Sequence, residues 1–160
     1  MTANGNIARF LGGDFDDIEY LGRGSSASVF RANQRSLGRP VAVKVFRCFA
    51  DDETDRVLAE ARTQASLSWH ANVVSLYDQG TTVDGFPYFV MEYAPGGSLE
   101  DRVRDRGALC ESEWRRLGME LSAAVAAAHD AGVVHCDVSR RTCSSLRTDR
   151  FASRTSGSPR

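Results

Sequence analysis

Short runs rich in β-branched and aromatic residues dominate the first half of the chain, and most are bounded by glycine, proline or polar residues. This pattern predicts strands. The runs are IEYLG at 18–22, ASVFRAN at 27–33, VAVKVF at 41–46, VVSLYDQG at 73–80 and PYFVMEY at 87–93. The polar stretch at 34–40 between the second and third runs predicts a turn or loop.

Helical periodicity appears once between the strand runs and then prevails after them. Residues 51–68 begin with acids and carry an apolar stripe, 98–107 form a short candidate, and 111–132 form a long one. Strands followed by helices predict an α+β fold with a sheet-rich first half. The apolar face expected on the long helix consists of Trp114, Leu117, Leu121, Ala124, Val125 and Ala128.

Composition narrows the class of protein. The 160 residues suit one domain, and 42% hydrophobic with 26% charged residues is typical of a soluble globular protein. A net charge of −1 favours neither nucleic acid nor membrane as a partner, and no apolar run approaches the roughly 20 residues of a membrane span. The N-terminus lacks signal-peptide features. Four cysteines without CxxC spacing predict reduced thiols in a cytoplasmic protein and no metal site.

The segment LGRGSSASV, residues 21–29, places two glycines between two predicted strands. A glycine-rich turn lets backbone N–H groups approach phosphate oxygens because no Cβ intervenes. An ordinary hairpin is the alternative interpretation. The segment comprises Leu21, Gly22, Arg23, Gly24, Ser25, Ser26, Ala27, Ser28 and Val29.

Lys44 is the sole lysine among the 20 lysine and arginine residues, and it lies on an otherwise apolar predicted strand. Arginine serves everywhere else, so the exception indicates a need for a compact ammonium group. Chance placement is the alternative. A lysine on such a strand requires an anionic partner, and Glu60 on the following helix is the candidate, unless it is simply a solvated helix residue.

Together these motifs resemble the bacterial eukaryotic-like (Hanks-type) serine/threonine protein kinases over about residues 15–138. Three further segments agree: LSWHANVV with His70 and Asn72, YFVMEYAPGGSL, and HDAGVVHCDV. The resemblance implies a kinase N-terminal lobe of five antiparallel strands plus helix C, with only the first helices of the C-terminal lobe. The implied divisions are a flexible lead-in at 1–13, lobe and hinge at 14–94, the start of the second lobe at 95–138, and a tail at 139–160.

The resemblance also implies roles for individual residues. The 21–29 segment would cover the phosphates of ATP, and Lys44 would hold the α- and β-phosphates while pairing with Glu60. Asp137 would accept the proton of a protein substrate's hydroxyl, and Mg²⁺ is the metal expected for the family. The adenine ring would meet Val29, Ala42, the gatekeeper Met91, and the backbone of Glu92, Tyr93 and Ala94.

Three departures from the family pattern put activity in doubt. Ala27 replaces a third glycine, and Cys136 replaces the arginine that precedes the catalytic aspartate. The third departure is the tail after Val138: Ser139 and Thr142 stand where the lysine and asparagine of KPxN are expected, and the DFG motif due about 18 residues after Asp137 is absent. The protein ligands for Mg²⁺ are therefore missing.

A single-base shift explains the tail. With allowed codons for 138–160 and one inserted base, the shifted frame reads VKPSNVLVAADGPLRLTDFGIAA, which restores both motifs in register. We therefore interpret 139–160 as an out-of-frame, disordered tail rather than a basic arm for nucleic acid.

These observations predict a serine/threonine kinase family member whose chain, as printed, is inactive. The alternatives are a nucleotide-binding pseudokinase-like module that acts with a partner, a non-functional pseudogene product, and a sequencing error that hides an intact kinase. The long helix would also be left partly uncovered, which predicts self-association.

Overall fold

The computed structural model describes residues 11, 13–24, 26–47, 57, 59, 61, 62 and 65–132. They belong to two compact units. The first unit contains the five strands and includes Ser75–Tyr93, and the second contains Ser66–Val74 and the described residues from Ala94 to Gly132. The division into 1–13, 14–94, 95–138 and 139–160 stays a prediction, and its last segment lies outside the described residues.

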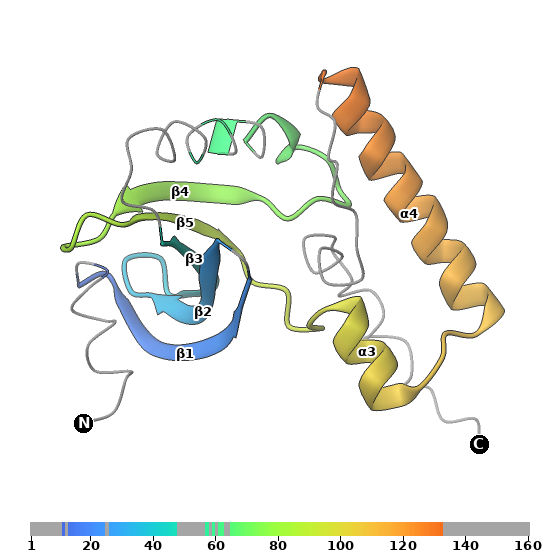
Figure 1. Ribbon diagram of the computed structural model, residues 1–160, viewed down its shortest axis with the longest axis horizontal. Coiled ribbons are helices and arrows are strands. Elements are labelled where there is room, and N and C mark those ends of the chain that lie inside the picture. Colours follow the sequence, from blue (N-terminus) through green and yellow to red (C-terminus); the bar gives the residue numbers. More distant parts are fainter. Residues whose placement is uncertain are drawn as a thin grey trace. The chain divides into compact units, whose positions relative to one another are not determined.

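The first unit is built on one antiparallel sheet whose strand order is β1-β2-β3-β5-β4 (Figure 1). Each strand pairs with its neighbour in antiparallel register, and β1 curves strongly in Figure 1. This arrangement confirms the predicted α+β class with a sheet-rich first half. The strands are β1 Phe15–Arg23, β2 Ala27–Gln34, β3 Arg39–Phe46, β4 Leu76–Thr81 and β5 Pro87–Glu92.

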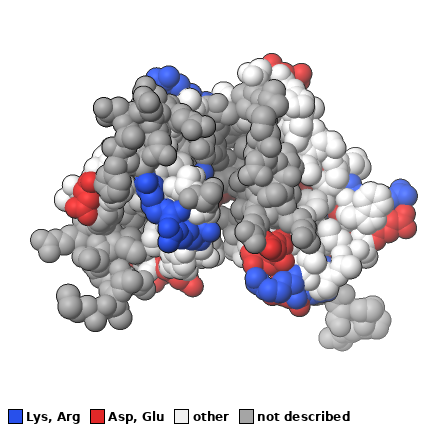
Figure 2. Space-filling model, viewed as in Figure 1, with Lys and Arg blue, Asp and Glu red and all other residues white. Residues whose placement is uncertain are grey.

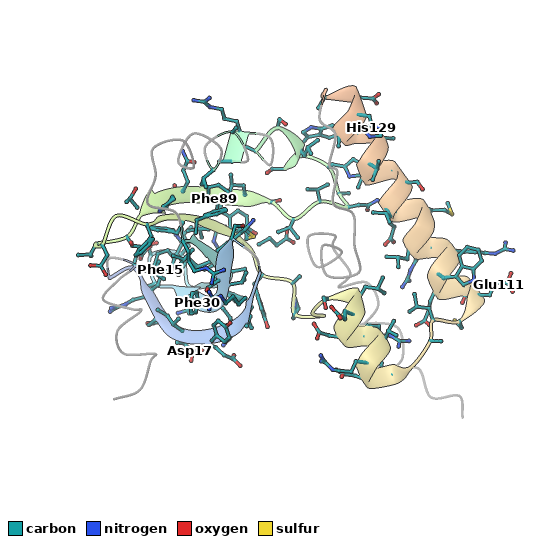
Figure 3. The ribbon with its side chains drawn as sticks, in the orientation of Figure 1. Phe15, Asp17, Phe30, Phe89, Glu111 and His129 are labelled. Atoms are coloured by element: carbon teal, nitrogen blue, oxygen red, sulfur yellow. The ribbon has the colours of Figure 1, made fainter. Side chains whose placement is uncertain are left out.

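Alternating side chains along these strands form two apolar clusters, one on each face of the sheet. One cluster includes Phe15, Phe30 and Val43, and Figure 3 shows Phe15 and Phe30 inside the curl of the first strands. The other cluster includes Phe46 and Phe89. Helical residues from the segment after β3 complete this second cluster, namely Val57 and Ala61.

The largest differences from the predicted strand boundaries are the starts of β1 and β4, and both have local reasons. β1 begins at Phe15 and not at Ile18, because Phe15 pairs with Gln34 and packs into the core despite the acids that follow it. β4 begins at Leu76 and not at Val73, because the N–H of Val73 donates to the carbonyl of His70 at 3.0 Å and closes a turn.

The second unit contains α3 Leu99–Arg106 and α4 Glu111–Asp130. Ser98 begins α3 with a capping box, in which Ser98 Oγ accepts from the Asp101 N–H at 3.1 Å and Asp101 Oδ2 accepts from the Ser98 N–H at 3.0 Å. An ion pair links the two helices, since Arg102 Nη2 lies 2.9 Å from Glu113 Oε1.

The beginning of α4 holds a carboxylate in its charged form. The N–H of Cys110 donates to Glu113 Oε2 at 2.9 Å, and Arg102 donates to the other oxygen. These bonds, the one from Cys110 first, lower the pKa of Glu113 from its usual 4.5 to about 2. The electrostatics of this helix start therefore stabilise the contact between α3 and α4 near neutral pH.

Surface charge on the visible face is mixed. In Figure 2 the described Lys and Arg side chains form small clusters, with Asp and Glu side chains close to several of them. Among the described residues, this view shows no single extended basic surface.

None of the helices in the described part of the chain combines the length and the apolar content needed to cross a membrane.

Candidate functional site

A tight hairpin joins β1 to β2 at the two glycines identified from the sequence. The N–H of Gly24 donates to the carbonyl of Ala27 at 2.8 Å, and Arg23 pairs with Ser28 just before the turn. Gly22 lies at the end of β1 opposite Val29. The hairpin thus places the predicted phosphate-binding segment at one end of the first two strands.

Neither glycine is required by the protein's own packing. A Cβ added at Gly22 would meet nothing within 4 Å, and one at Gly24 would meet only the Ala27 carbonyl oxygen at 3.8 Å. Neither residue has a positive φ. The space beside the backbone is therefore open to a ligand that approaches closely, which is the requirement of a phosphate cradle.

Ala27, which replaces a third glycine, has a different environment. It is the first residue of β2, only 3% exposed, and its methyl group packs in the cluster with Phe46 and Phe89. Its side chain is part of the core, so any contact between Ala27 and a ligand would use its backbone.

The strand register places the other predicted site residues of the sheet on one face. Val29 lies directly opposite Lys44, which lies opposite Phe89. Two positions along, Ala42 lies opposite Met91. Directly paired residues, and residues two apart on a strand, share a face. Val29, Ala42, Lys44 and Met91 therefore line the same face of the sheet.

Lys44 lies among aromatic side chains on this face. Its Nζ is 4.7 Å from the centroid of the Phe46 ring, and that ring meets Phe89 edge-on at 4.7 Å. Lys44 is half-buried, whereas Ala42 is buried. A partly exposed lysine whose ammonium lies over an aromatic ring can bind an anion through the same charge.

The end of β5 supplies the predicted adenine contacts, but one backbone group is already engaged. The N–H of Glu92 donates to the Ser75 carbonyl at 2.9 Å, and Glu92 Oε2 accepts from the Ser75 N–H at 3.3 Å. Of the two backbone groups of Glu92, the carbonyl oxygen is therefore the candidate for a hydrogen bond with adenine. Tyr93 follows in the first unit, and Ala94 belongs to the second unit.

Three predicted site residues, Ser25, Glu60 and Asp137, lie outside the described residues. The pairing of Lys44 with Glu60 and the catalytic role of Asp137 therefore stay predictions. The remaining predicted residues of the first unit fall into three groups, which are the hairpin, the sheet face and the end of β5 described above.

Two arginines next to these groups were not identified from the sequence. Arg31, two positions along from Val29, lies 3.1 Å from Asp17 Oδ2 and 5.7 Å from the centroid of the Tyr93 ring. Figure 3 shows Asp17 on the outer side of β1. Arg47, directly after β3, donates from Nη2 to the Gly24 carbonyl at 2.8 Å. Nothing in the sequence distinguishes these two from the many other arginines.

His70 and Asn72, identified from the sequence, form structural contacts in the second unit. Asn72 Nδ2 donates to the Glu120 carbonyl of α4 at 3.1 Å, and the Asn72 N–H donates to His70 Nδ1 at 3.2 Å. The segment Ser66–Val74 is thereby fastened to the middle of α4.

Comparisons with known proteins find similar sequences. The family model described as "Protein kinase domain" matches residues 15–141. The chain is 39% identical over 132 residues to serine/threonine-protein kinase PknK of Mycobacterium tuberculosis, and the match covers 82% of this chain and 12% of the relative. It is 33% identical over 135 residues to PrkC of Bacillus subtilis, covering 82% and 20%. It is 34% identical over 153 residues to PksC of Streptomyces coelicolor, covering 86% and 27%. The chain thus spans about a quarter or less of the length of these relatives.

Proposed function

Because this chain belongs to the serine/threonine protein kinase family, we propose that the first unit binds ATP on the face of the sheet that carries Lys44. The observation that supports this most is the register. It places Lys44 opposite Val29, and Ala42 opposite Met91, so that an ammonium group and a small apolar surface share one face. A triphosphate attached to a flat apolar base requires this combination.

Each group on the face has a distinct part in binding. Val29, Ala42 and Met91 pack against the adenine ring and exclude water from its faces. Lys44 attracts the α- and β-phosphates, and the open backbone at Gly22 and Gly24 lets hairpin N–H groups approach the phosphate oxygens. Bound ATP would supply the phosphoryl group. In this family Mg²⁺ helps to neutralise the negative charge of the phosphates.

A nucleotide titration tests the binding proposal. We expect Lys44→Met to weaken ATP binding by roughly tenfold or more, since one charge-assisted contact to phosphate contributes on the order of 1.5–3 kcal/mol. The methionine keeps the apolar stem over Phe46, so this part of the packing should be retained.

The matched control is Arg35→Met, which removes one positive charge from the exposed turn between β2 and β3. It should leave ATP affinity within about twofold of the original. Equal ATP affinities for the original chain and Lys44→Met would contradict the proposal.

We further propose that the chain as printed does not transfer phosphate. This proposal rests on the residues present at 139 and 142, Ser139 and Thr142, where phosphoryl transfer needs a lysine and a magnesium-binding asparagine. Incubation with labelled ATP, Mg²⁺ or Mn²⁺ and a generic acceptor protein should give no transfer above background. Transfer that is lost in Asp137→Asn would overturn this proposal.

A single-base shift after Val138 is our proposal for the origin of Ser139 and Thr142. The match to the kinase family model ends at residue 141, close to this position. The DNA provides the test, because the codons from Ser139 onward must read KPSN and DFG after one inserted base. Codons that give these motifs in no frame would reject the shift.

A second function, as a nucleotide-binding module that acts through a partner, is favoured by one feature of α4. Trp114 is 54% exposed and Met119 is 75% exposed. Self-association through this helix stays a prediction, and sedimentation of the original chain and of Trp114→Glu at several concentrations would test it.

A further inference from the structure

Arg47 connects the end of β3 to the glycine hairpin through two hydrogen bonds. Its backbone N–H donates to the Ser26 carbonyl at 3.0 Å, and its Nη2 donates to the Gly24 carbonyl at 2.8 Å. The first bond extends the pairing of β2 with β3 by one residue beyond Ala27 and Phe46. The second bond reaches Gly24 in the turn. The side chain of Arg47 therefore contacts a residue that lies beyond the pairing of β2 with β3.

These bonds determine which way the hairpin's peptide groups point. In a trans peptide the C=O and the N–H point in opposite directions. The Ser26 carbonyl is turned toward Arg47, so the N–H of the same peptide, which belongs to Ala27, points away from it. This bond uses the backbone of Arg47, so any residue other than proline at position 47 could make it, and only the Nη2 bond to the Gly24 carbonyl depends on the arginine side chain.

The hairpin has little else to hold it. Gly22 and Gly24 carry no side chain to pack, and a Cβ at Gly22 would find no atom within 4 Å, so open space lies beside this part of the backbone. Within the described residues, the hydrogen bonds across the turn are the one between Gly24 and Ala27 and the two from Arg47. A flexible turn must lose conformational entropy when it binds a ligand.

Arg47 lies three residues after Lys44 and directly follows the end of β3. The position of the hairpin relative to the Lys44 ammonium therefore depends on a short stretch of paired strand and one guanidinium contact. Arginine suits this contact, because its planar fork is pre-organised and less freedom is lost per hydrogen bond formed.

We propose that Arg47 is a positioning residue that holds the glycine hairpin over Lys44 before a nucleotide binds. Affinity for the phosphate groups then depends on Arg47, whereas affinity for the base and sugar does not. This inference rests on the proposed ATP site. Arg47 acts through the hairpin backbone and need not contact the ligand.

The test compares ATP with adenosine as probes on the full chain, by calorimetric titration at one fixed Mg²⁺ concentration. Arg47→Met removes the guanidinium contact and keeps the backbone N–H. It should weaken ATP binding by about tenfold, the change expected when binding must order about one backbone residue that was previously held. Adenosine binding should stay within about twofold. Arg35→Met again serves as the matched control, with both affinities unchanged.

Hydrogen exchange distinguishes a local effect on the hairpin from a general loss of stability, because a general loss would accelerate exchange in other strands as well. In Arg47→Met, exchange in a peptide covering 22–28 should accelerate at least fivefold, while a peptide from β5 keeps its original rate. Arg47→Lys keeps the charge but loses the planar fork, so it should restore hairpin protection and ATP affinity only in part.

The outcomes separate this inference from the proposed function. If adenosine and ATP both fail to bind the original chain, the ATP site is wrong and the inference falls with it. If both bind, and Arg47→Met leaves the ratio of their affinities unchanged, only the inference is wrong. Full recovery of ATP affinity in Arg47→Lys without recovery of hairpin protection would show a charge effect, and would also overturn it.

Discussion

Gly22 and Gly24 allow stability and ligand binding to be separated at the scale of single residues. Open space surrounds a Cβ at Gly22, and one at Gly24 makes only an ordinary contact at 3.8 Å. Alanine at either position should therefore change the free energy of unfolding by less than about 1 kcal/mol. The same methyl group would occupy the space reserved for phosphate, so ATP affinity should fall several-fold. Urea unfolding and ATP titration of both variants measure the two effects.

Gly80 on β4 supplies the contrasting control. A Cβ there would lie 2.6 Å from the Tyr88 ring, so Gly80→Ala should destabilise the sheet by roughly 1–3 kcal/mol. It lies outside the proposed site, and ATP affinity of the folded fraction should be unchanged. The interpretation of the hairpin glycines would be wrong if Gly22→Ala and Gly24→Ala proved as destabilising as Gly80→Ala with unchanged ATP affinity.

Sequence alone predicted residues whose chemistry is exceptional and missed those whose chemistry is common. Lys44 could be found because it is the single lysine, and the glycine pair because its spacing is characteristic. Arg47 could not be found, because its contact to Gly24 depends on where β3 ends relative to the hairpin. The irregular backbone at Asp17 was also not predicted. Its φ of +49° coincides with a register shift in β1, and the acidic residues there give no sign of a strand in the sequence.

At the scale of elements, the start of α4 responds to pH through Glu113. The N–H of Cys110 and then Arg102 lower the pKa of Glu113 to about 2, below the 4.5 expected in the unfolded chain. Its contribution to stability is therefore complete above about pH 4.5 and is lost as the pH falls toward 2. Glu113→Gln should be less stable than the original chain at pH 7, and the difference should shrink between pH 4.5 and 2.

Urea unfolding followed by far-UV circular dichroism at pH 7 and pH 3 measures this difference. Glu111→Gln is the control, since Glu111 lies in the same turn and forms an exposed pair with Arg115 at 2.8 Å. It should cost little at either pH. A stability difference for Glu113→Gln that does not narrow at low pH would contradict the assigned role.

The sequence pattern located the elements better than their ends. Alternation and β-branched content predicted five strands and two later helices, because burial on the sheet imposes that pattern. The beginning of β4 depended instead on the turn at His70, and the fastening of Asn72 to α4 depends on a carbonyl 48 residues away. Contacts between distant segments leave no local signal in one sequence.

At the scale of the whole molecule, family membership and the activity of this particular chain are separate matters. The match to the kinase family rests on residues 15–141, whereas phosphoryl transfer also needs groups that the printed residues after Val138 do not supply.

Inserting one base into the Ser139 codon, and translating the DNA that follows, should produce KPSN and DFG and yield phosphate transfer to a generic acceptor. The control is the same insertion combined with Asp137→Asn, which should abolish transfer. A repaired chain that carries both motifs, folds and binds ATP but transfers nothing would contradict the shift as the cause of the proposed inactivity.

The most direct measurement of the central claim, that ATP binds with its phosphates at Lys44, is covalent labelling by an acyl-phosphate analogue of ATP. Lys44 is the sole lysine, so among side chains it alone carries an amine that such a reagent can acylate. Mass spectrometry should find Lys44 modified, and an excess of ATP should protect it. Labelling confined to the N-terminal amine, or equal labelling of Lys44 with and without ATP, would contradict the site.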